Sequence, residues 1–237
     1  KVEQIRELRK TILLPPYQAD YRIVLLLRFE EANPSAANAL LKTLEEAPKQ
    51  VILLLTANNT EALLPTIVSR CEVIRLHPVP LGKVENFLRE KGADEEKAKL
   101  LAHLSAGRPG YALRLFEDEN ELQARQEHID KFRELLTASR VARFAYAEEL
   151  AKDKDLFREN LLLWLSLWRD VMLHAAGETD AIANIDQREL IESLAEKLSL
   201  AEAKKRLAST EKGIDQLKRY VNARLLAENI LLDFPKG

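Results

Sequence analysis

Two short, continuous apolar runs place the strongest constraint on the fold of this 237-residue chain. The runs Arg22–Leu27 and Val51–Leu55 have the length of strands and contain β-branched residues. Runs without alternation of polar and apolar residues are typical of strands buried on both faces of a parallel sheet. Between them, Asn33 supplies an N-cap and Pro34 a first-turn proline, so we predict a helix from Asn33 to Glu46. Strand, helix and strand in this order predict a right-handed βαβ unit of an α/β sheet.

The segments on either side extend this α/β pattern. Four apolar residues at helical spacing predict a helix over residues 2–14, which Pro15 would end. Residues 61–69 are expected to form a short helix. Residues 73–76 are apolar and partly β-branched, so we predict a third strand there.

From residue 80 onward the strand pattern disappears and helical spacing takes over. Residues 81–91, 94–105 and 109–116 predict three short helices, which would form a small bundle. Residues 161–173 are apolar on nearly all sides, and this predicts a helix at the centre of a larger bundle. A last helix is expected to carry the apolar stripe from Leu207 to Ile230. The predicted fold class is α/β plus all-α, with no long flexible tether between the domains.

The composition excludes several classes of protein. Lys and Arg number 36 against 38 Asp and Glu, so the net charge does not predict a nucleic-acid binder. Cys71 is the only cysteine, so neither an intramolecular disulfide nor a cysteine metal site can form, and a reducing cytoplasm is expected. The longest apolar run, 161–168, is too short to span a membrane. Because the chain starts with Lys1 and its only methionine is Met172, we expect a fragment of a longer protein.

Two strings of residues stand on either side of the second predicted strand. They read Asn38-Ala-Leu-Leu-Lys-Thr-Leu-Glu-Glu46 and Leu64-Pro-Thr-Ile-Val-Ser-Arg-Cys71. Together they resemble the core of the clamp-loader subunits of bacterial DNA polymerase III, which belong to the AAA+ ATPase superfamily. Within that family the chain is most similar to the delta-prime subunits.

The resemblance implies a chain of three parts. Residues 1–78 would be a partial AAA+ parallel α/β domain, without the first strand and the phosphate-binding loop of that fold. Residues 79–119 would be a small helical lid domain, and residues 120–237 a C-terminal helical collar domain for oligomerisation. The tail from Tyr220 to Ile230 is similar to the last helix of such collar domains.

In active members of the family the strand after the phosphate loop ends in an acidic pair that supports magnesium and activates the attacking water. In this chain those two positions fall on Leu27 and Arg28, and neither side chain can do this work. The resemblance therefore implies a subunit that does not hydrolyse ATP. The alternative is a shifted register, in which Glu30 or Glu31 is catalytic.

Three further positions correspond to nucleotide-sensing positions of the family. Thr56 and Asn58 follow the second predicted strand, where a polar sensor residue is expected. The position of a second sensor arginine falls on Gly110, and Arg108 stands two residues earlier. Arg108 either contacts a nucleotide or caps a helix turn.

Ser69 and Arg70 occupy the place of the family's arginine finger. The resemblance implies that Arg70 reaches the nucleotide of a neighbouring subunit and stabilises the charge on its γ-phosphate. Arginine suits this role because its guanidinium is permanently charged and offers a planar fork of donors. The alternative is that Arg70 pairs with a nearby carboxylate of its own chain, either Glu72 or Glu45.

Four polar residues recur at helical spacing near the C-terminus, namely Asn222, Arg224, Glu228 and Asn229. They would form a polar seam in the collar, or Arg224 and Glu228 would simply pair within one helix.

The expected function is that of a non-hydrolysing clamp-loader subunit, and so a component of the DNA polymerase III holoenzyme that is no enzyme on its own. Its partners would be a gamma/tau-like ATPase and a delta-like subunit, with the sliding clamp and primed DNA reached through the complex. No cofactor is expected in this chain: ATP and magnesium would lie on the neighbouring subunit, and zinc would belong to the missing N-terminal part. The alternatives are a fragment of a catalytic gamma/tau-like ATPase and an AAA+-derived helical adaptor outside replication.

Overall fold

The computed structural model describes residues 2–12, 14, 16, 19–46, 48–219 and 221–235. Pro15, which was expected to end the first helix, and Tyr220 in the tail lie outside the described residues. The chain divides into two compact units, one up to Leu76 and the other from His77 onward, and each is described by itself. The predicted division into three parts therefore stays a prediction.

The first unit is built around two parallel strands, β1 (Arg22–Leu26) and β2 (Val51–Leu55). Arg22 is paired in register with Val51, and Leu26 with Leu55. Its helices are α1 (Val2–Ile12), the 3-10 helix η1 (Phe29–Glu31), α2 (Pro34–Glu45) and α3 (Pro65–Val68). The prediction of α2 is confirmed at its start, because the side chain of Asn33 accepts a hydrogen bond from the Ala36 amide.

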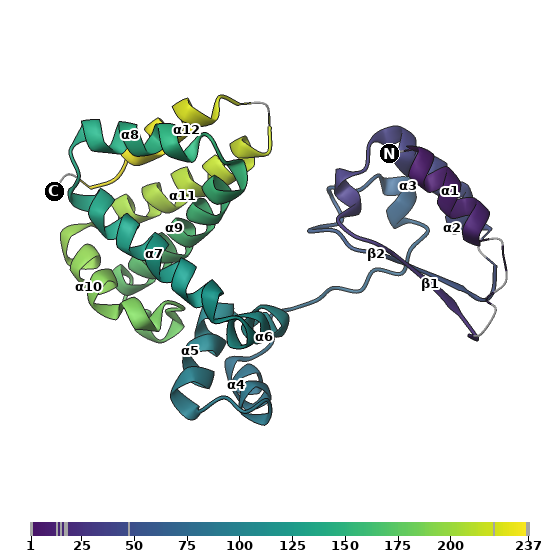
Figure 1. The fold of residues 1–237 in the computed structure, drawn as a ribbon, viewed down its shortest axis with the longest axis horizontal. Coiled ribbons are helices and arrows are strands. Elements are labelled where there is room, and N and C mark those ends of the chain that lie inside the picture. The colour runs from purple at the N-terminus through teal and green to yellow at the C-terminus, as the bar shows by residue number, and fades with distance from the viewer. Residues whose placement is uncertain are drawn as a thin grey trace. The chain divides into compact units, whose positions relative to one another are not determined.

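The sheet is covered on one face only, the face on which the helices of this unit lie (Figure 1). Leu26 and Leu55 pack there against the core around Leu40. On the other face Ile23 is 64% exposed and Leu25 is 55% exposed. The prediction that both faces are buried is therefore wrong for the described residues, since none of their elements covers the second face. Apolar character on both faces is what parallel strands need when a second layer is present.

Two element predictions in this unit are wrong in extent or in type. The predicted strand 73–76 is neither strand nor helix, and Leu76 is 93% exposed. A β-branched run becomes a strand only beside a partner strand, and the described sheet contains β1 and β2 alone. The predicted helix 61–69 is reduced to α3, which begins at Pro65 because proline is favoured in the first helical turn.

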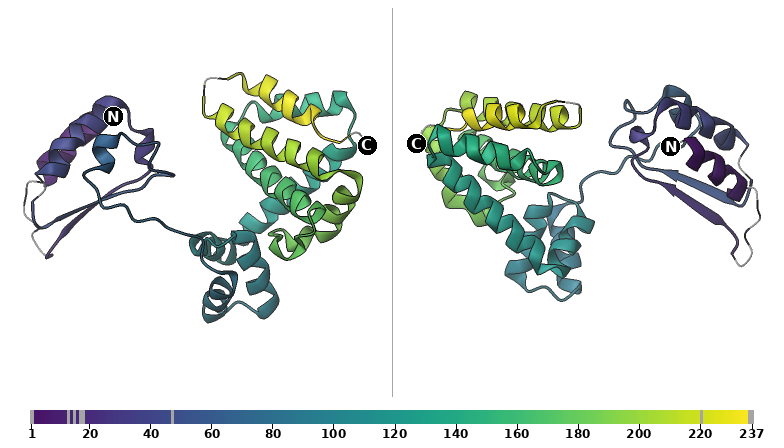
Figure 2. Two further views of the ribbon diagram at one scale, coloured as in Figure 1. Left: turned by 180° about the vertical axis from the view of Figure 1, so that it is seen from behind. Right: turned by 45° about the horizontal axis from the view of Figure 1, so that its top comes forward.

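The second unit is all-helical among its described residues (Figure 2). Its elements are α4 (Leu81–Glu90), α5 (Glu95–Ser105), α6 (Pro109–Glu117), α7 (Glu119–Thr137), α8 (Arg140–Leu150), α9 (Lys154–Ala175), η2 (Thr179–Ala181), η3 (Ile185–Gln187), α10 (Arg188–Lys197), α11 (Leu200–Leu217) and α12 (Ala223–Leu232). The short helices α4, α5 and α6 share a small core of their own, around Leu88, Leu101 and Leu115. The three short helices predicted after residue 80 are thus confirmed.

The larger core of this unit is centred on α9, as the all-round apolar pattern predicted. Trp164 and Trp168 are fully buried and meet Phe132 and Phe234. Three of these four ring pairs are edge-to-face, the arrangement favoured by the charge distribution of aromatic rings.

The last predicted helix is interrupted, and that prediction is wrong. The stripe from Leu207 to Ile230 is divided between α11, which ends at Leu217, and α12, which begins at Ala223. Asn222 ends the break, because its side chain accepts a hydrogen bond from the Leu225 amide and caps α12. Leu225 is exposed on α12, whereas Ile230 is buried.

In the part of the chain that the structure describes, no helix is both long enough and apolar enough to cross a membrane. Over the same residues, no group of three or more His, Cys, Asp or Glu side chains is arranged to hold a metal ion.

Candidate arginine-finger site

Arg70 lies two residues beyond the end of α3, whose position is set by packing. Ile67 on this helix is buried in the same core as Leu40 of α2. Pro65 starts the helix, and the Arg70 amide donates to the carbonyl oxygen of Ile67 as the last turn closes. The guanidinium therefore extends from a short, well-anchored turn at the exposed side of α2 and α3.

The guanidinium of Arg70 is bound by Glu45, the last residue of α2. Nε of Arg70 donates to Oε1 of Glu45 at 2.6 Å, and its NH2 lies 2.5 Å from the same oxygen. The side chains remain accessible, with 36% of Arg70 and 47% of Glu45 exposed. Of the two carboxylates offered by the sequence, Glu45 is the partner of Arg70 in this structure, and sequence reasoning could name it only as an alternative.

Ser69 and Thr66 lie on the other side of the fork. NH1 of Arg70 donates to the carbonyl oxygen of Thr66 at 3.1 Å and contacts Oγ of Ser69 at 3.4 Å. Ser69 in turn donates to the Thr66 carbonyl at 3.2 Å. Ser69 thus helps to hold Arg70. Cys71 is half-buried, and burial raises the pKa of its thiol, which agrees with a packing role.

Thr56 joins the carboxyl ends of the two strands. Its Oγ1 accepts from the Arg28 amide at 2.9 Å, and its carbonyl accepts from the Phe29 amide at 2.8 Å. Arg28 has a left-handed backbone with φ of 49°, and its side chain pairs with Glu31 at 3.2 Å. Leu27 is exposed beside it. The two positions expected for the acidic pair therefore lie in a turn beyond β1, with no carboxylate on either of them.

Glu30 and Asn58 are also brought together at this edge of the sheet. Oε1 of Glu30 accepts from the Asn58 amide at 3.3 Å, while Oε2 is buried without a hydrogen-bond partner in the described structure. Next to them is a cavity of about 300 Å³. It is lined by Phe29, Glu30, Ala32, Pro34, Ala37, Glu61, Ala62, Leu63, Leu64 and Ile67. Among the described residues, no hydrogen bond or ion pair joins Arg70 to Thr56 or Asn58.

Arg108, in the second unit, caps a helix turn. Its Nε donates to the Ser105 carbonyl at 2.8 Å, and its guanidinium lies 4.9 Å from the ring centroid of Tyr111. Gly110, the expected position of a second sensor arginine, is the second residue of α6, and no atom lies within 4 Å of where its Cβ would be. These contacts correspond to the capping alternative for Arg108.

Asn222, Arg224 and Glu228 of the tail are engaged within the helical unit itself. Arg224 pairs with Glu228 at 2.9 Å and with Glu148 of α8 at 3.1 Å. Both the intrahelical pair expected from the sequence and a bridge to α8 are therefore present. The partner carboxylates raise the pKa of Arg224, whose hydrogen bond to Glu228 contributes most.

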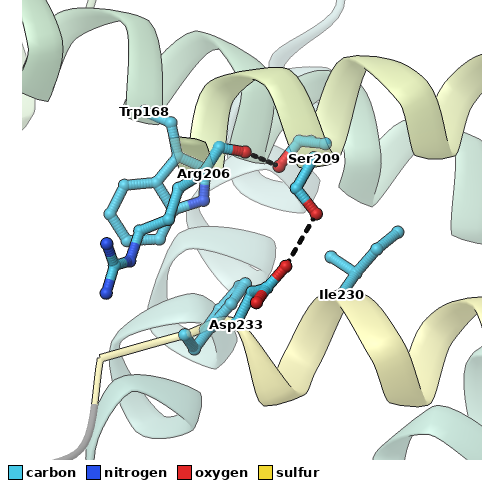
Figure 3. Close-up of a pocket in the computed structure, with 7 residues that line it drawn as sticks. Trp168, Arg206, Ser209, Ile230 and Asp233 are labelled. Atoms are coloured by element: carbon cyan, nitrogen blue, oxygen red, sulfur yellow. Dashed lines mark hydrogen bonds between the residues drawn. The ribbon is translucent and has the colours of Figure 1, made fainter. Parts of the chain in front are cut away.

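A shallow crevice lies between α9, α11 and α12. In Figure 3 the guanidinium of Arg206 lies beside the ring of Trp168, at 5.9 Å from its centroid, and Ser209 points toward Asp233. The Ser209 hydroxyl donates to Asp233 at 2.9 Å. The lining side chains fill this crevice and leave no space for a water molecule, so it is not a ligand site.

Comparisons with known proteins agree with the resemblance found in the sequence. The family described as "DNA polymerase III, delta subunit" matches residues 1–80, and its C-terminal counterpart matches residues 119–236. DNA polymerase III subunit delta′ of Bacillus subtilis is 26% identical over 251 aligned residues, which cover 100% of this chain and 73% of the relative. The delta′ subunit of Pseudomonas aeruginosa is 29% identical, over 98% of this chain and 70% of the relative. The gamma subunit of Buchnera aphidicola is 31% identical over 57% of this chain, which spans 39% of that relative.

The fold and the matched families together define the class of protein. It has an α/β part with a parallel two-stranded sheet, followed by an all-helical part, as the predicted fold class of α/β plus all-α stated. Both halves of the chain match clamp-loader families, and the delta′ relatives align over nearly its whole length. The chain belongs to the delta-prime clamp-loader subunits of bacterial DNA polymerase III.

Proposed function

We propose that this chain is a non-hydrolysing clamp-loader subunit that lends Arg70 in trans to the nucleotide of a neighbouring ATPase. In this role it supports ATP-dependent loading of the sliding clamp on primed DNA. In the complex this chain is a rigid neighbour of the ATPase subunit and contributes the positive charge of Arg70. The hydrolysis of ATP occurs on the ATPase subunit.

The observation that carries this proposal is the chemistry at the carboxyl end of β1. Leu27 and Arg28 occupy the two positions of the acidic pair, and the turn that holds them is closed by Thr56. Glu31 is paired with Arg28, and Glu30 is tied to the Asn58 amide. A site that must hold Mg²⁺ and activate water needs carboxylates in those two places. Arg70, by contrast, is accessible and carries the charge that a γ-phosphate needs.

A catalytic gamma-type subunit is the second candidate, because the Buchnera gamma subunit is similar to this chain over 57% of its length. In that case Glu30 would be the catalytic carboxylate, and the cavity beside it would face the nucleotide. The buried, unpartnered Oε2 of Glu30 favours this candidate, and the residues at positions 27 and 28 argue against it. Membership of the clamp-loader family argues against an adaptor outside replication.

The partners in this proposal are the gamma-type and delta-type subunits of a clamp loader. The sliding clamp and primed DNA are reached through that complex, and the protein acts in the cytoplasm. ATP and magnesium are held by the neighbour, and a zinc site would belong to a longer form of the protein. Within the family the collar is the part that assembles the subunits, so residues 120–237 are assigned that role here.

The test is the DNA-stimulated ATPase activity of a reconstituted clamp loader that contains the complete parent protein. Arg70→Ala is expected to lower turnover at the adjacent site by about 10³-fold, the effect of an arginine finger. The matched control is Arg75→Ala, which removes an exposed arginine five residues later. A second variant, Glu30→Gln, separates the two candidates, since only a catalytic gamma-type subunit would lose its own ATP turnover.

Assembly is monitored by size-exclusion chromatography for every variant. Unchanged turnover of an intact Arg70→Ala complex would show that Arg70 is structural and that the subunit acts as a scaffold alone. Loss of turnover on Glu30→Gln would instead support the gamma-type candidate.

A further inference from the structure

The contacts of Arg70 leave part of its fork unused. A guanidinium carries five N–H bonds, two of them on NH2. Among the described residues, NH2 has one acceptor within reach, Oε1 of Glu45, which also takes the N–H of Nε. NH1 is engaged by Thr66 and Ser69 on the other side. The guanidinium is thus held on both flanks while at least one N–H of NH2 remains for another acceptor.

Glu45 is itself firmly placed, although it occupies an unfavourable position. It is the last residue of α2, a helix anchored by the buried Leu40 and capped by Asn33. A carboxylate in the last turn meets the negative end of the helix dipole, which is electrostatically unfavourable. The guanidinium of Arg70 neutralises that carboxylate. The pair therefore serves both partners: α2 gains a compensating charge and Arg70 gains a fixed direction.

We propose that Glu45 is a positioning residue that aims Arg70 before a phosphate group of a neighbouring subunit arrives. The inference rests on the proposed function and adds a residue to its machinery. A free arginine side chain samples many rotamers, and fixing it on demand costs conformational entropy at the moment of reaction. Glu45 fixes the fork in advance and leaves an N–H of NH2 for a phosphate oxygen, the acceptor that arginine recognises best.

The size of the effect follows from the exposure of the pair. Because 36% of Arg70 and 47% of Glu45 are accessible, water and salt screen their attraction. Exposed ion pairs shift equilibria by about 2- to 5-fold. Loss of Glu45 should therefore lower turnover by about 2- to 5-fold, far less than loss of Arg70 itself. Loss of Glu45 should lower kcat and leave the KM for ATP unchanged. The reason is that the positioned guanidinium of Arg70 contacts the charge that develops during the reaction.

The experiment uses the complete parent protein in the reconstituted clamp loader, with kcat and KM measured for four variants. These are Glu45→Ala, Glu45→Gln, Arg70→Ala and the double variant Glu45→Ala with Arg70→Ala. We expect Glu45→Ala to lower kcat about 2- to 5-fold. Glu45→Gln should restore most of the rate, because its amide oxygen still accepts from Nε. The double variant should match Arg70→Ala alone, since Glu45 acts through Arg70. The control is Glu46→Ala, which removes the adjacent carboxylate that faces Lys42 at 3.9 Å.

Each outcome decides between the inference and the function on which it rests. An inactive finger, seen as unchanged turnover of Arg70→Ala, overturns both. A strong effect of Arg70→Ala with wild-type kcat for Glu45→Ala overturns the positioning role alone. The positioning role is also overturned if Glu45→Ala lowers kcat by the same factor when Arg70 is already replaced by alanine. If Glu45→Ala fails to assemble, Glu45→Lys is the second variant: it repels Arg70, and a wild-type kcat of its assembled complex would equally overturn the inference.

Discussion

The guanidinium of Arg143 donates a hydrogen bond of 3.1 Å to the carbonyl oxygen of Leu231, and it thereby joins the start of α8 to the end of α12. Its other N–H groups reach the carbonyl oxygens of Leu135, Leu136, Phe234 and Pro235. All five N–H bonds of this buried side chain are thus used on backbone carbonyls. A positive charge at the carboxyl ends of two helices also meets the negative ends of their dipoles.

Replacement of Arg143 should strongly destabilise the helical unit. Arg143→Met removes every one of these hydrogen bonds and leaves buried carbonyl oxygens without a donor, at about 1–3 kcal/mol for each unsatisfied group. We expect the free energy of unfolding to fall by about 3 kcal/mol or more. Urea unfolding followed by tryptophan fluorescence measures this, because Trp164 and Trp168 are both buried in the core of this unit. The exposed Arg140→Met on the same helix is the control, and an equal loss there would contradict the assignment.

Burial lowers the pKa of Arg143, yet the group stays charged at any ordinary pH. Arg143→Lys is therefore an informative companion to the methionine variant. Lysine keeps the charge but has three donors in place of the five of arginine. It should recover part of the lost stability, and full recovery would show that charge alone accounts for the role of Arg143.

A second prediction concerns Gly107, in the turn between α5 and α6. Gly107 has φ of +77°, and a Cβ there would lie 2.8 Å from the carbonyl oxygen of Val79. The Val79 amide also donates to the Gly107 carbonyl at 2.8 Å, so the two backbones cannot easily separate. We expect Gly107→Ala to lower the free energy of unfolding by about 1–3 kcal/mol.

Gly110 provides a matched control three residues later. Its Cβ would meet no atom within 4 Å, and it lies in α6. Gly110→Ala should therefore be neutral or stabilising, by up to about 1 kcal/mol, because alanine has the higher helix propensity. Urea unfolding of both variants checks the pair, and equal effects would refute the role given to the backbone contact of Gly107.

A third prediction concerns Asp170, a fully buried carboxylate on α9. Its Oδ2 accepts from the amides of Ala183 and Asn184, at 3.1 and 2.7 Å, and from Nδ2 of Asn184 at 2.7 Å. Asp170→Ala leaves these buried donors unpaired and should cost about 2–4 kcal/mol. Asp170→Asn keeps an acceptor oxygen and should cost less. Faster hydrogen exchange of the Ala183 and Asn184 amides in Asp170→Ala would report the loss of their hydrogen bonds directly. The control is Asp180→Ala, which replaces an exposed carboxylate and should leave this exchange unchanged.

Local signals in the sequence were sufficient for the elements that depend on neighbours in the chain. Asn33 and Pro34 predicted the start of α2 because capping is a contact between residues three positions apart. The prediction of a strand at 73–76 is wrong because a strand needs a partner strand, and the local sequence does not show whether one is present. The break before Asn222 was missed because the apolar stripe continues across it.

The candidate site shows the same division. The string that ends in Cys71 singled out Arg70, and in the structure this residue lies at an accessible turn. Its partner could not be chosen from the sequence, because Glu45 stands 25 residues away and Glu72 only two. Only the packing of α3 against α2 decides between these carboxylates. The finger role of Arg70 stays a prediction.

The last prediction follows from Tyr146, a half-buried phenol on α8 that donates to Oδ1 of Asn160 at 3.3 Å. Burial, together with the negative charges of Glu149 and Glu134, raises the pKa of Tyr146 to about 12. An unfolded tyrosine titrates near pH 10, so the folded state holds this proton more tightly. The stability that results is fully present below about pH 10 and is lost as the pH rises toward 12. We therefore expect the wild-type protein to lose stability relative to Tyr146→Phe over this range. Urea unfolding of both proteins at pH 9, 10 and 11 measures the difference, and parallel curves would show that Tyr146 titrates normally.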